Sequence, residues 1–254
     1  MGIVYGYCTD TGTRKKVNQD SFCIKNASIG NKSVTLAIIC DGMGGLSKGE
    51  LASGSMINAF SKWFEKDLQD SGLEVETIRM QWEDLIRRGN EKLYQYGLQN
   101  GIQLGTTLTV LLLVDEKEYF IAHVGDSRAY VARERMNQIT EDQSFVAREI
   151  QRGRMTVEQA KTDPRKNVLL QCVGASKDVK PVYYSGQIEK GDGYLLCSDG
   201  FRHMLDECEM LAGIELIRKN CEQENIDIIL RNLVNENMQR GETDNITVLY
   251  LQIN

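Results

Sequence analysis

The chain has 254 residues with only two prolines and no low-complexity linker, so we expect a single domain over residues 1–254 that buries a substantial core. Its net charge of −6 argues against a nucleic-acid partner, because binding to backbone phosphates requires clustered Lys and Arg. Its seven cysteines are odd in number and form no CxxC pair, which argues against a disulfide framework and a zinc site and indicates a reducing, cytoplasmic setting.

The first hundred residues predict strands followed by helices. Residues 2–40 contain short apolar or alternating blocks typical of three strands, with turns at Thr11-Gly12 and Gly30-Asn31, and the strand-like start does not resemble a signal peptide. The apolar period then changes to three or four residues, which predicts two long amphipathic helices with their apolar stripes in the core. These stripes are Ala52, Met56, Phe60, Trp63 and Phe64, then Ile78, Trp82, Leu85, Ile86 and Leu93.

The rest of the chain predicts further blocks of strands and helices. We expect strands at 106–115, 119–124, 127–131, 182–188, 193–198 and 246–253, and helices at 206–219 and 226–239, with a less regular region at 140–174. The longest apolar run, Thr107 to Val114, is far too short for a membrane-spanning helix. Blocks of each type, rather than strict alternation, favour antiparallel sheets covered by helix pairs over a doubly wound parallel sheet.

Short acidic turns lie beside several of the strand-like runs. Any one of them can be a plain turn, since Asp and Gly both tolerate turn geometry. If the strand ends converge, however, several carboxylates meet, and they repel one another unless a cation neutralises them. The pattern therefore predicts a site for a hard divalent cation. The turns are Asn18-Gln19-Asp20, Asp41-Gly42-Met43-Gly44-Gly45, Gly125-Asp126-Ser127, Ser198-Asp199-Gly200 and Thr243-Asp244-Asn245.

In order and spacing, these motifs resemble those of the metal-dependent serine/threonine protein phosphatases of type 2C, the PPM family, in their compact bacterial form. The resemblance spans nearly the whole chain and includes Asp10-x-Gly12 and Gly105-Thr-Thr107. It implies an α+β fold, a sandwich of two antiparallel β-sheets flanked by helix pairs in α-β-β-α layers. It also implies hydrolysis of phosphoserine and phosphothreonine in proteins by direct attack of a metal-activated water.

The resemblance assigns roles to the acidic residues. Asp41 would bridge two Mg²⁺ or Mn²⁺ ions, with the Gly42 carbonyl on one and Asp199 and Asp244 completing the other. Asp20 would hold a metal-bound water, and Asp126 would help to hold a third, weaker ion. Oxygen ligands suit these hard ions, and a two-metal site can activate water for an in-line displacement. The alternative for Asp126 is a turn carboxylate that pairs with Arg128.

Some residues depart from the family pattern. Lys15 stands where the family usually places a phosphate-binding arginine, and Arg14 is its neighbour. Lysine offers a point charge instead of a bidentate fork, so Arg14 or Lys15 would contact phosphate, unless Arg14-Lys15-Lys16 is simply a solvated turn. Gln19 replaces a frequent metal-facing glutamate.

The chain has two histidines, and Met43 occupies the place of the histidine proposed as general acid in animal members. His123 lies inside a predicted strand, which is typical of a core or supporting residue. His203 follows the Ser198-Asp199-Gly200 turn, and the family assigns it no role. The resemblance would then leave protonation of the leaving group to metal-bound water.

Three hypotheses on function follow. The first is a phosphatase that acts on phosphorylated proteins, including a serine/threonine kinase and its substrates, as a monomer. The second, kept open by Lys15 and Gln19, is a catalytically silent phosphoprotein-binding module of the same fold. The third is a broad small-molecule phosphatase. Residues 143–174 correspond to a flap beside the active site in bacterial relatives, and its basic side chains either meet acidic peptide segments or form a solvated surface.

Overall fold

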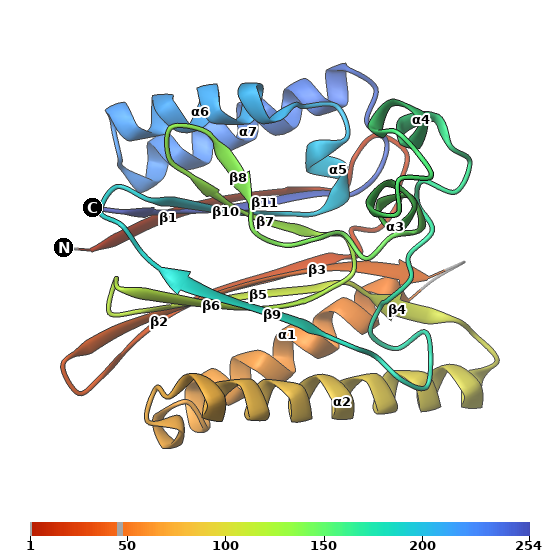
Figure 1. Cartoon of the computed structure of the whole chain (residues 1–254), viewed down its shortest axis with the longest axis horizontal. Helices are drawn as coiled ribbons and strands as arrows, with labels where there is room; N and C mark the ends of the chain where they lie inside the picture. Colours follow the sequence, from red (N-terminus) through yellow and green to blue (C-terminus); the bar gives the residue numbers. More distant parts are fainter. Residues whose placement is uncertain (1, 45–47) are drawn as a thin grey trace.

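The computed structural model describes residues 2–44 and 48–254, which form four layers (Figure 1). Two antiparallel sheets lie face to face, and a helix pair covers the outer side of each. This arrangement is the predicted α+β sandwich with α-β-β-α layers. Gly45, the last residue of one acidic turn, lies outside the described residues.

The first sheet has the strand order β1-β11-β10-β7-β8. Its strands are β1 (Ile3–Asp10), β7 (Arg128–Ala132), β8 (Met136–Gln138), β10 (Gly193–Cys197) and β11 (Ile246–Ile253). β1 and β11 pair along their full length, from Ile3 opposite Ile253 to Asp10 opposite Ile246. The two ends of the chain are therefore neighbours in one sheet, as Figure 1 shows. The short strand β8 is not among the predicted elements.

The second sheet has the order β2-β3-β5-β6-β9, and β4 also pairs with β3. Its strands are β2 (Asp20–Ile29), β3 (Lys32–Gly44), β4 (Leu104–Thr106), β5 (Leu108–Val114), β6 (Glu118–Val124) and β9 (Val182–Gln187). The single strand expected at 106–115 is wrong in one respect, because it is interrupted at Thr107. There the Thr107 hydroxyl, 2.9 Å away, accepts the hydrogen bond of the Asp41 N–H.

Helix pairs cover both sheets as the periodicity predicts. α1 (Gly49–Lys66) and α2 (Val75–Asn100) pack on the second sheet, and α6 (Glu207–Lys219) and α7 (Gln223–Gln239) on the first. The remaining helices are short: α3 (Phe145–Gln151), α4 (Val157–Thr162), α5 (Asp199–Arg202) and a 3-10 turn at Gln69–Ser71. None of the helices in the described ranges is both long and apolar enough to cross a membrane.

The aromatic residues of the predicted helix stripes form the contact between α1 and α2. The Trp82 ring meets Phe60 and Trp63 edge-on, with centroid distances of 5.7 and 5.5 Å. All three side chains are almost fully buried. Edge-to-face pairs of this kind add about 0.5–1.5 kcal/mol each to the stabilisation from area burial.

Strand β3 is buried on both faces, which explains its continuous apolar run. Leu36 and Ile38 face the helices α1 and α2, whereas Ala37 and Ile39 face the other sheet. Burying a Leu or Ile side chain fully contributes about 1.5–3 kcal/mol. This packing holds the end of β3 rigidly, and Asp41, an acidic residue of the candidate site, lies there.

Candidate metal centre

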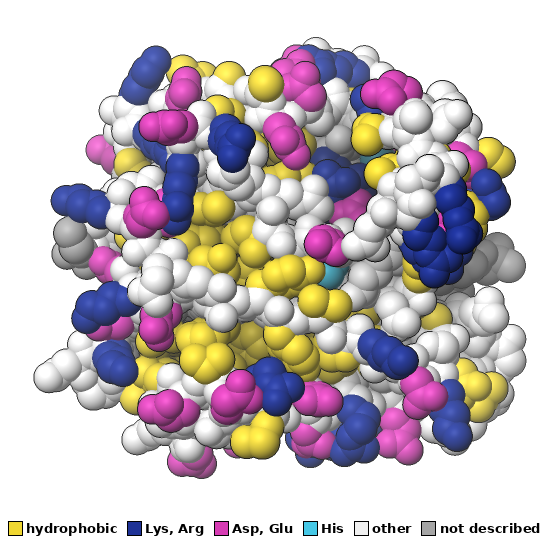
Figure 2. Space-filling model, in the orientation of Figure 1, with side chains coloured by type: hydrophobic (Ala, Val, Ile, Leu, Met, Phe, Trp, Pro, Cys, Tyr) yellow, Lys and Arg dark blue, Asp and Glu magenta, His cyan; other side chains and the backbone are white. Residues whose placement is uncertain are grey.

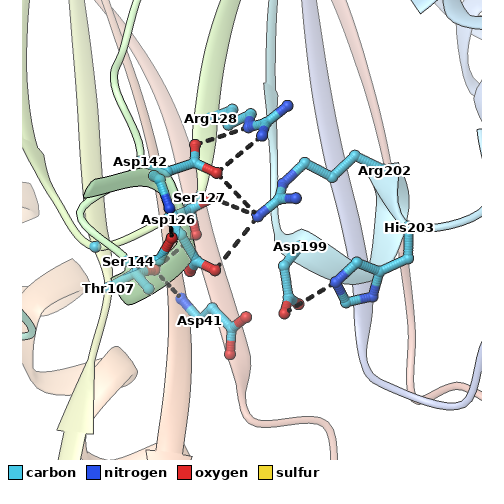
Figure 3. Close-up of polar contacts among 12 residues, drawn as sticks. Asp41, Thr107, Asp126, Ser127, Arg128, Asp142, Ser144, Asp199, Arg202 and His203 are labelled. Atoms are coloured by element: carbon cyan, nitrogen blue, oxygen red, sulfur yellow. Dashed lines mark hydrogen bonds and ion pairs between the residues drawn. The ribbon is translucent and has the colours of Figure 1, made fainter. Parts of the chain in front are cut away.

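The acidic turns meet at one end of the sandwich. Figure 3 shows the carboxylates of Asp41, Asp126 and Asp199 pointing toward one another from different strand ends. Asp20 opens β2, and Asp244 lies just before β11. Residues as far apart in the chain as Asp20 and Asp244 are thus gathered in one acidic cluster.

Asp20 and Asp41 are direct cross-strand partners in the β2–β3 ladder. Directly opposed like charges destabilise a sheet, so this pair is unfavourable without a counterion. Burial, aided by the charges of Asp199 and Asp244, raises the pKa of Asp20 to about 7, although the Thr247 and Ser198 hydroxyls oppose this shift. Burial and the charges of Asp20 and Asp199 also raise the pKa of Asp41 well above its usual range.

The backbone of Asp41 is held by two threonines. The Thr107 hydroxyl accepts the Asp41 N–H at 2.9 Å, and the Thr106 hydroxyl and Thr107 N–H donate to the Asp41 carbonyl at 3.0 and 2.9 Å. The Thr107 hydroxyl also lies 2.7 Å from that of Ser127, beside Asp126. The Gly105-Thr106-Thr107 motif therefore supports Asp41.

Gly42 lies where no side chain fits. A Cβ atom there would lie 2.3 Å from the carbonyl oxygen of Gly49 and 2.5 Å from that of Gln19. Only glycine permits so close an approach of three backbone segments. The residue also leaves its own carbonyl without a shielding side chain, as a carbonyl ligand requires.

Asp199 is the first residue of the short helix α5, which follows β10 directly. The preceding Ser198 hydroxyl donates to Asp20 Oδ2 and accepts from the Thr247 N–H, both at 2.9 Å. A Cβ atom on Gly200 would lie 2.2 Å from the carbonyl oxygen of Asn245, so the 198–200 turn packs tightly on the turn before β11.

His203 lies at the end of α5 between two carboxylates. Its Nδ1 is 2.9 Å from Glu242 Oε2, and its Nε2 is 3.5 Å from Asp199 Oδ2. Burial lowers the pKa of His203, but the Glu242 hydrogen bond and the Asp199 charge outweigh it and raise the pKa above its usual value. The buried Glu242 carboxylate also accepts the N–H groups of Thr243 and Asp244 at 2.6 and 2.8 Å.

Asp126 pairs with Arg202 and not with Arg128, the partner given in the alternative interpretation. Arg202 Nη2 lies 3.3 Å from Asp126 Oδ2 and 3.5 Å from Asp142 Oδ2 (Figure 3). The alternative of an Asp126–Arg128 pair is wrong, because Arg128 binds Asp142 in a bidentate manner at 2.7 and 2.8 Å. Burial and the charge of Asp199 raise the pKa of Asp126 to about 7 despite Arg202.

Lys15 and Arg14 have different surroundings in the structure. Lys15 Nζ lies 2.8 Å from Asp244 Oδ1, whereas the Arg14 side chain is exposed and forms no hydrogen bond or ion pair with the described residues. Burial lowers the pKa of Lys15, but the hydrogen bond to Asp244 and the charges of Asp41 and Asp199 outweigh this effect and raise the pKa above its usual value. Gln19 faces Glu50, whose Oε2 accepts its side-chain amide at 3.3 Å.

His123 is a core residue, as its place in a strand indicated. It is fully buried, its Nδ1 lies 3.0 Å from the Thr109 hydroxyl, and its Nε2 lies 3.1 Å from the carbonyls of Gly125 and Glu141. Burial lowers its pKa to about 4. The ring is therefore neutral at pH 7 and ties the Asp126 turn to the segment that follows β8.

The region at 143–174 lies at the same end of the sandwich, and Lys and Arg side chains gather beside it (Figure 2). Arg148, Arg152 and Arg154 surround Glu149, with N–O distances of 3.2, 3.9 and 3.6 Å. Part of this basic charge is thus balanced inside the region itself.

Two buried oxygens test whether the residues fit a cation. Among the described residues, Asp20 Oδ1 and Asp199 Oδ1 are buried and accept no hydrogen bond. Buried polar atoms are normally paired, and a divalent ion is a partner that carboxylate oxygens accept. Within residues 2–44 and 48–254, no three Asp, Glu, His or Cys side chains converge as closely as the ligands of one bound ion.

Several supporting residues are absent from the sequence-based prediction. Ser198, Thr107 and Asn245 belong to the quoted motifs, so their presence at the site could have been inferred. Asn245 Oδ1 accepts the Gln19 N–H at 2.9 Å. Arg202 and Asp142 carry no local signal, because their partners lie in other parts of the chain.

Comparisons with known proteins match the chain to one family. The family model described as Protein phosphatase 2C matches residues 11–236. A "Serine/threonine phosphatase stp" of Listeria innocua is 32% identical over 254 residues, covering 97% of this chain and 94% of that protein.

Solved structures give the same result. The S. agalactiae serine/threonine phosphatase has a TM-score of 0.88 and 30% identity, with all of both chains covered. The catalytic domain of the phosphatase PstP, described as a complex with 2 manganese ions, has a TM-score of 0.79 and 26% identity, with 99% of each chain covered.

Proposed function

Because this chain belongs to the protein phosphatase 2C family and is a protein-serine/threonine phosphatase, we propose that its acidic cluster is the metal centre of that enzyme. Asp41, the Gly42 carbonyl, Asp199 and Asp244 would hold two divalent ions. Asp20 would support them from beside Asp41, and Asp126 would contribute to a third ion. The observation that carries this proposal is the pair of buried oxygens on Asp20 and Asp199, which have no hydrogen-bond partner among the residues that the structure describes.

Mg²⁺ and Mn²⁺ are the ions that we propose. An all-oxygen site suits both, and the PstP structure with manganese supports Mn²⁺ by similarity. When bound, such ions supply Lewis acidity that activates water and neutralises the phosphoryl oxygens.

The protein's own groups hold this chemistry in place. Thr106 and Thr107 hold the backbone of Asp41, and the Ser198 hydroxyl orients Asp20 by donating to its Oδ2. Lys15 forms an ion pair with Asp244 of the cluster, so we propose that Lys15, and not its neighbour Arg14, contacts the substrate phosphate.

Substrates are phosphoserine and phosphothreonine residues of proteins. We propose that they include a serine/threonine kinase and its targets, and that the enzyme works as a monomer in the cytoplasm, with residues 1–254 as one catalytic domain. The seven free cysteines and the core shared by both sheets support the reducing location and the single domain. The phosphatase relatives favour catalysis over the silent module.

Hydrolysis assays test the proposal. We would measure turnover of p-nitrophenyl phosphate and a phosphothreonine peptide with Mn²⁺, with Mg²⁺ and with EDTA, for wild type and Asp199→Asn. We expect metal-dependent turnover that Asp199→Asn abolishes. Asp70→Asn, the same change at an exposed site, is the control and should leave turnover unchanged. Equal turnover by Asp199→Asn would refute the assigned centre, and competition between peptide and small esters would expose a broad small-molecule phosphatase.

A further inference from the structure

His203 and Glu242 connect the two turns that carry Asp199 and Asp244. The imidazole lies between Glu242 Oε2, at 2.9 Å, and Asp199 Oδ2, at 3.5 Å. The other oxygen of Glu242 accepts the N–H groups of Thr243 and Asp244. One continuous chain of contacts therefore runs from the Asp199 side chain to the Asp244 backbone.

The two oxygens of Asp199 have different surroundings. Oδ2 faces His203 (Figure 3), whereas Oδ1 is buried without a partner among the described residues. A carboxylate held by one oxygen presents the other in a defined direction. Groups behind a ligand commonly orient it in this way, and their loss typically costs about 10–100-fold in metal affinity.

Other contacts already fix the backbone of these turns. The Ser198 hydroxyl binds the Thr247 N–H, and Gly200 packs against the Asn245 carbonyl. The His203–Glu242 pair is thus not needed to bring the two segments together. What it adds is the orientation of the Asp199 carboxylate and of the N–H groups at 243 and 244.

We propose that His203, through Glu242, is a positioning residue that orients Asp199 and the Asp244 turn for divalent-metal binding. This inference rests on the proposed metal centre. It assigns a function to a histidine that no motif of the resemblance includes.

Direct binding of Mn²⁺ tests the inference without an activity assay. Isothermal titration of the full chain would give the dissociation constant for wild type, His203→Ala, Glu242→Gln and the double variant. We expect about 10–100-fold weaker Mn²⁺ binding in each single variant. The double variant should lose little more, because the two residues act as one unit. Met204→Ala, at the exposed neighbouring position, should bind as wild type does.

Two conservative variants separate orientation from folding. Asparagine at 203 places an amide nitrogen near the position of Nδ1, which faces Glu242, and glutamine places one near Nε2, which faces Asp199. His203→Asn and His203→Gln should both fold, as judged by circular dichroism, and both bind Mn²⁺ more weakly than wild type but more tightly than His203→Ala. If His203→Ala does not fold, these two variants carry the test.

The outcomes are distinguishable. Wild-type affinity in the folded His203 variants overturns the positioning role while leaving the metal centre intact. Loss of Mn²⁺ binding only together with loss of circular dichroism signal overturns it as well. If wild type binds no Mn²⁺, or Asp199→Asn binds it equally well, the metal centre itself fails and the inference fails with it.

Discussion

Asp20 and Asp41 face each other across the β2–β3 ladder, at the point where both strands reach the acidic cluster. Elsewhere in a sheet this pairing would be selected against, since opposed like charges repel. Here it places two carboxylates on one face with a backbone held by Thr107. In the proposed metal centre, a cation would offset this unfavourable pairing.

The pH dependence of stability without metal is the first prediction. The pKa of Asp20 is raised from 3.8 to about 7, so the folded state binds its proton more tightly than the unfolded state does. The contribution of Asp20 to the free energy of unfolding therefore falls as pH rises from about 4 to about 7. Asp20→Asn should stabilise the metal-free protein at pH 8 by on the order of 2–4 kcal/mol and have little effect at pH 4.

Urea unfolding in EDTA at pH 4 and pH 8 measures this difference. Glu91→Gln removes an exposed carboxylate on α2 and should change stability by less than about 0.5 kcal/mol. Adding Mn²⁺ should stabilise wild type more than Asp20→Asn. Equal or lower stability of Asp20→Asn at pH 8 in EDTA would contradict the unfavourable pairing.

Arg202 is expected to stabilise the fold through two carboxylates. Its side chain is only 14% exposed and contacts Asp126 and Asp142. Arg202→Met leaves these buried charges less compensated and should cost about 3–5 kcal/mol in urea unfolding at pH 7. Arg87→Met breaks an ion pair whose arginine is 66% exposed, and should cost less than about 1 kcal/mol. Similar losses of unfolding free energy in Arg202→Met and Arg87→Met would contradict the stabilising role of Arg202.

Lys15 and Arg14 should differ in phosphate binding. Lys15 pairs with Asp244 of the acidic cluster, whereas Arg14 is exposed and forms no ion pair with a described residue. A hydrogen bond to a charged group contributes about 1.5–3 kcal/mol, so Lys15→Ala should weaken inhibition by inorganic phosphate by about 10–100-fold. Arg14→Ala should change the inhibition constant by less than about twofold. If Arg14→Ala has the larger effect, the assignment of the phosphate contact must be reversed.

Two glycines on either side of the β3–α1 connection should respond in opposite ways to alanine. At Gly42 the added methyl meets the Gly49 carbonyl oxygen at 2.3 Å, and backbone cannot give way cheaply. Gly42→Ala should cost about 3 kcal/mol or more. Gly54, inside α1, has open space around it, so Gly54→Ala should stabilise the protein by about 0.5–1 kcal/mol. Thermal unfolding of both variants measures these changes in stability. A Gly42→Ala variant as stable as wild type would refute the close backbone approach at Gly42.

Local pattern sufficed for most of the fold. The three-to-four-residue spacing that includes Phe60, Trp63 and Trp82 predicted α1 and α2, because a helix has to bury one face. The strand blocks and the position of each acidic turn could also be predicted, because alternation and turn chemistry depend on only a few neighbouring residues. The break at Thr107 was not, because it depends on a hydrogen bond to Asp41, 66 residues away.

The arrangement of the site depended on contacts between distant segments. The acidic motifs identified which carboxylates matter, but not that Arg202 rather than Arg128 faces Asp126, nor that His203 lies between Asp199 and Glu242. Lys15 and Arg14 are adjacent in the chain, so the sequence does not tell which of them meets the cluster. The tertiary structure places Lys15 against Asp244. Periodicity reports which side of an element is apolar, whereas the partner of a charged side chain is chosen by the fold as a whole.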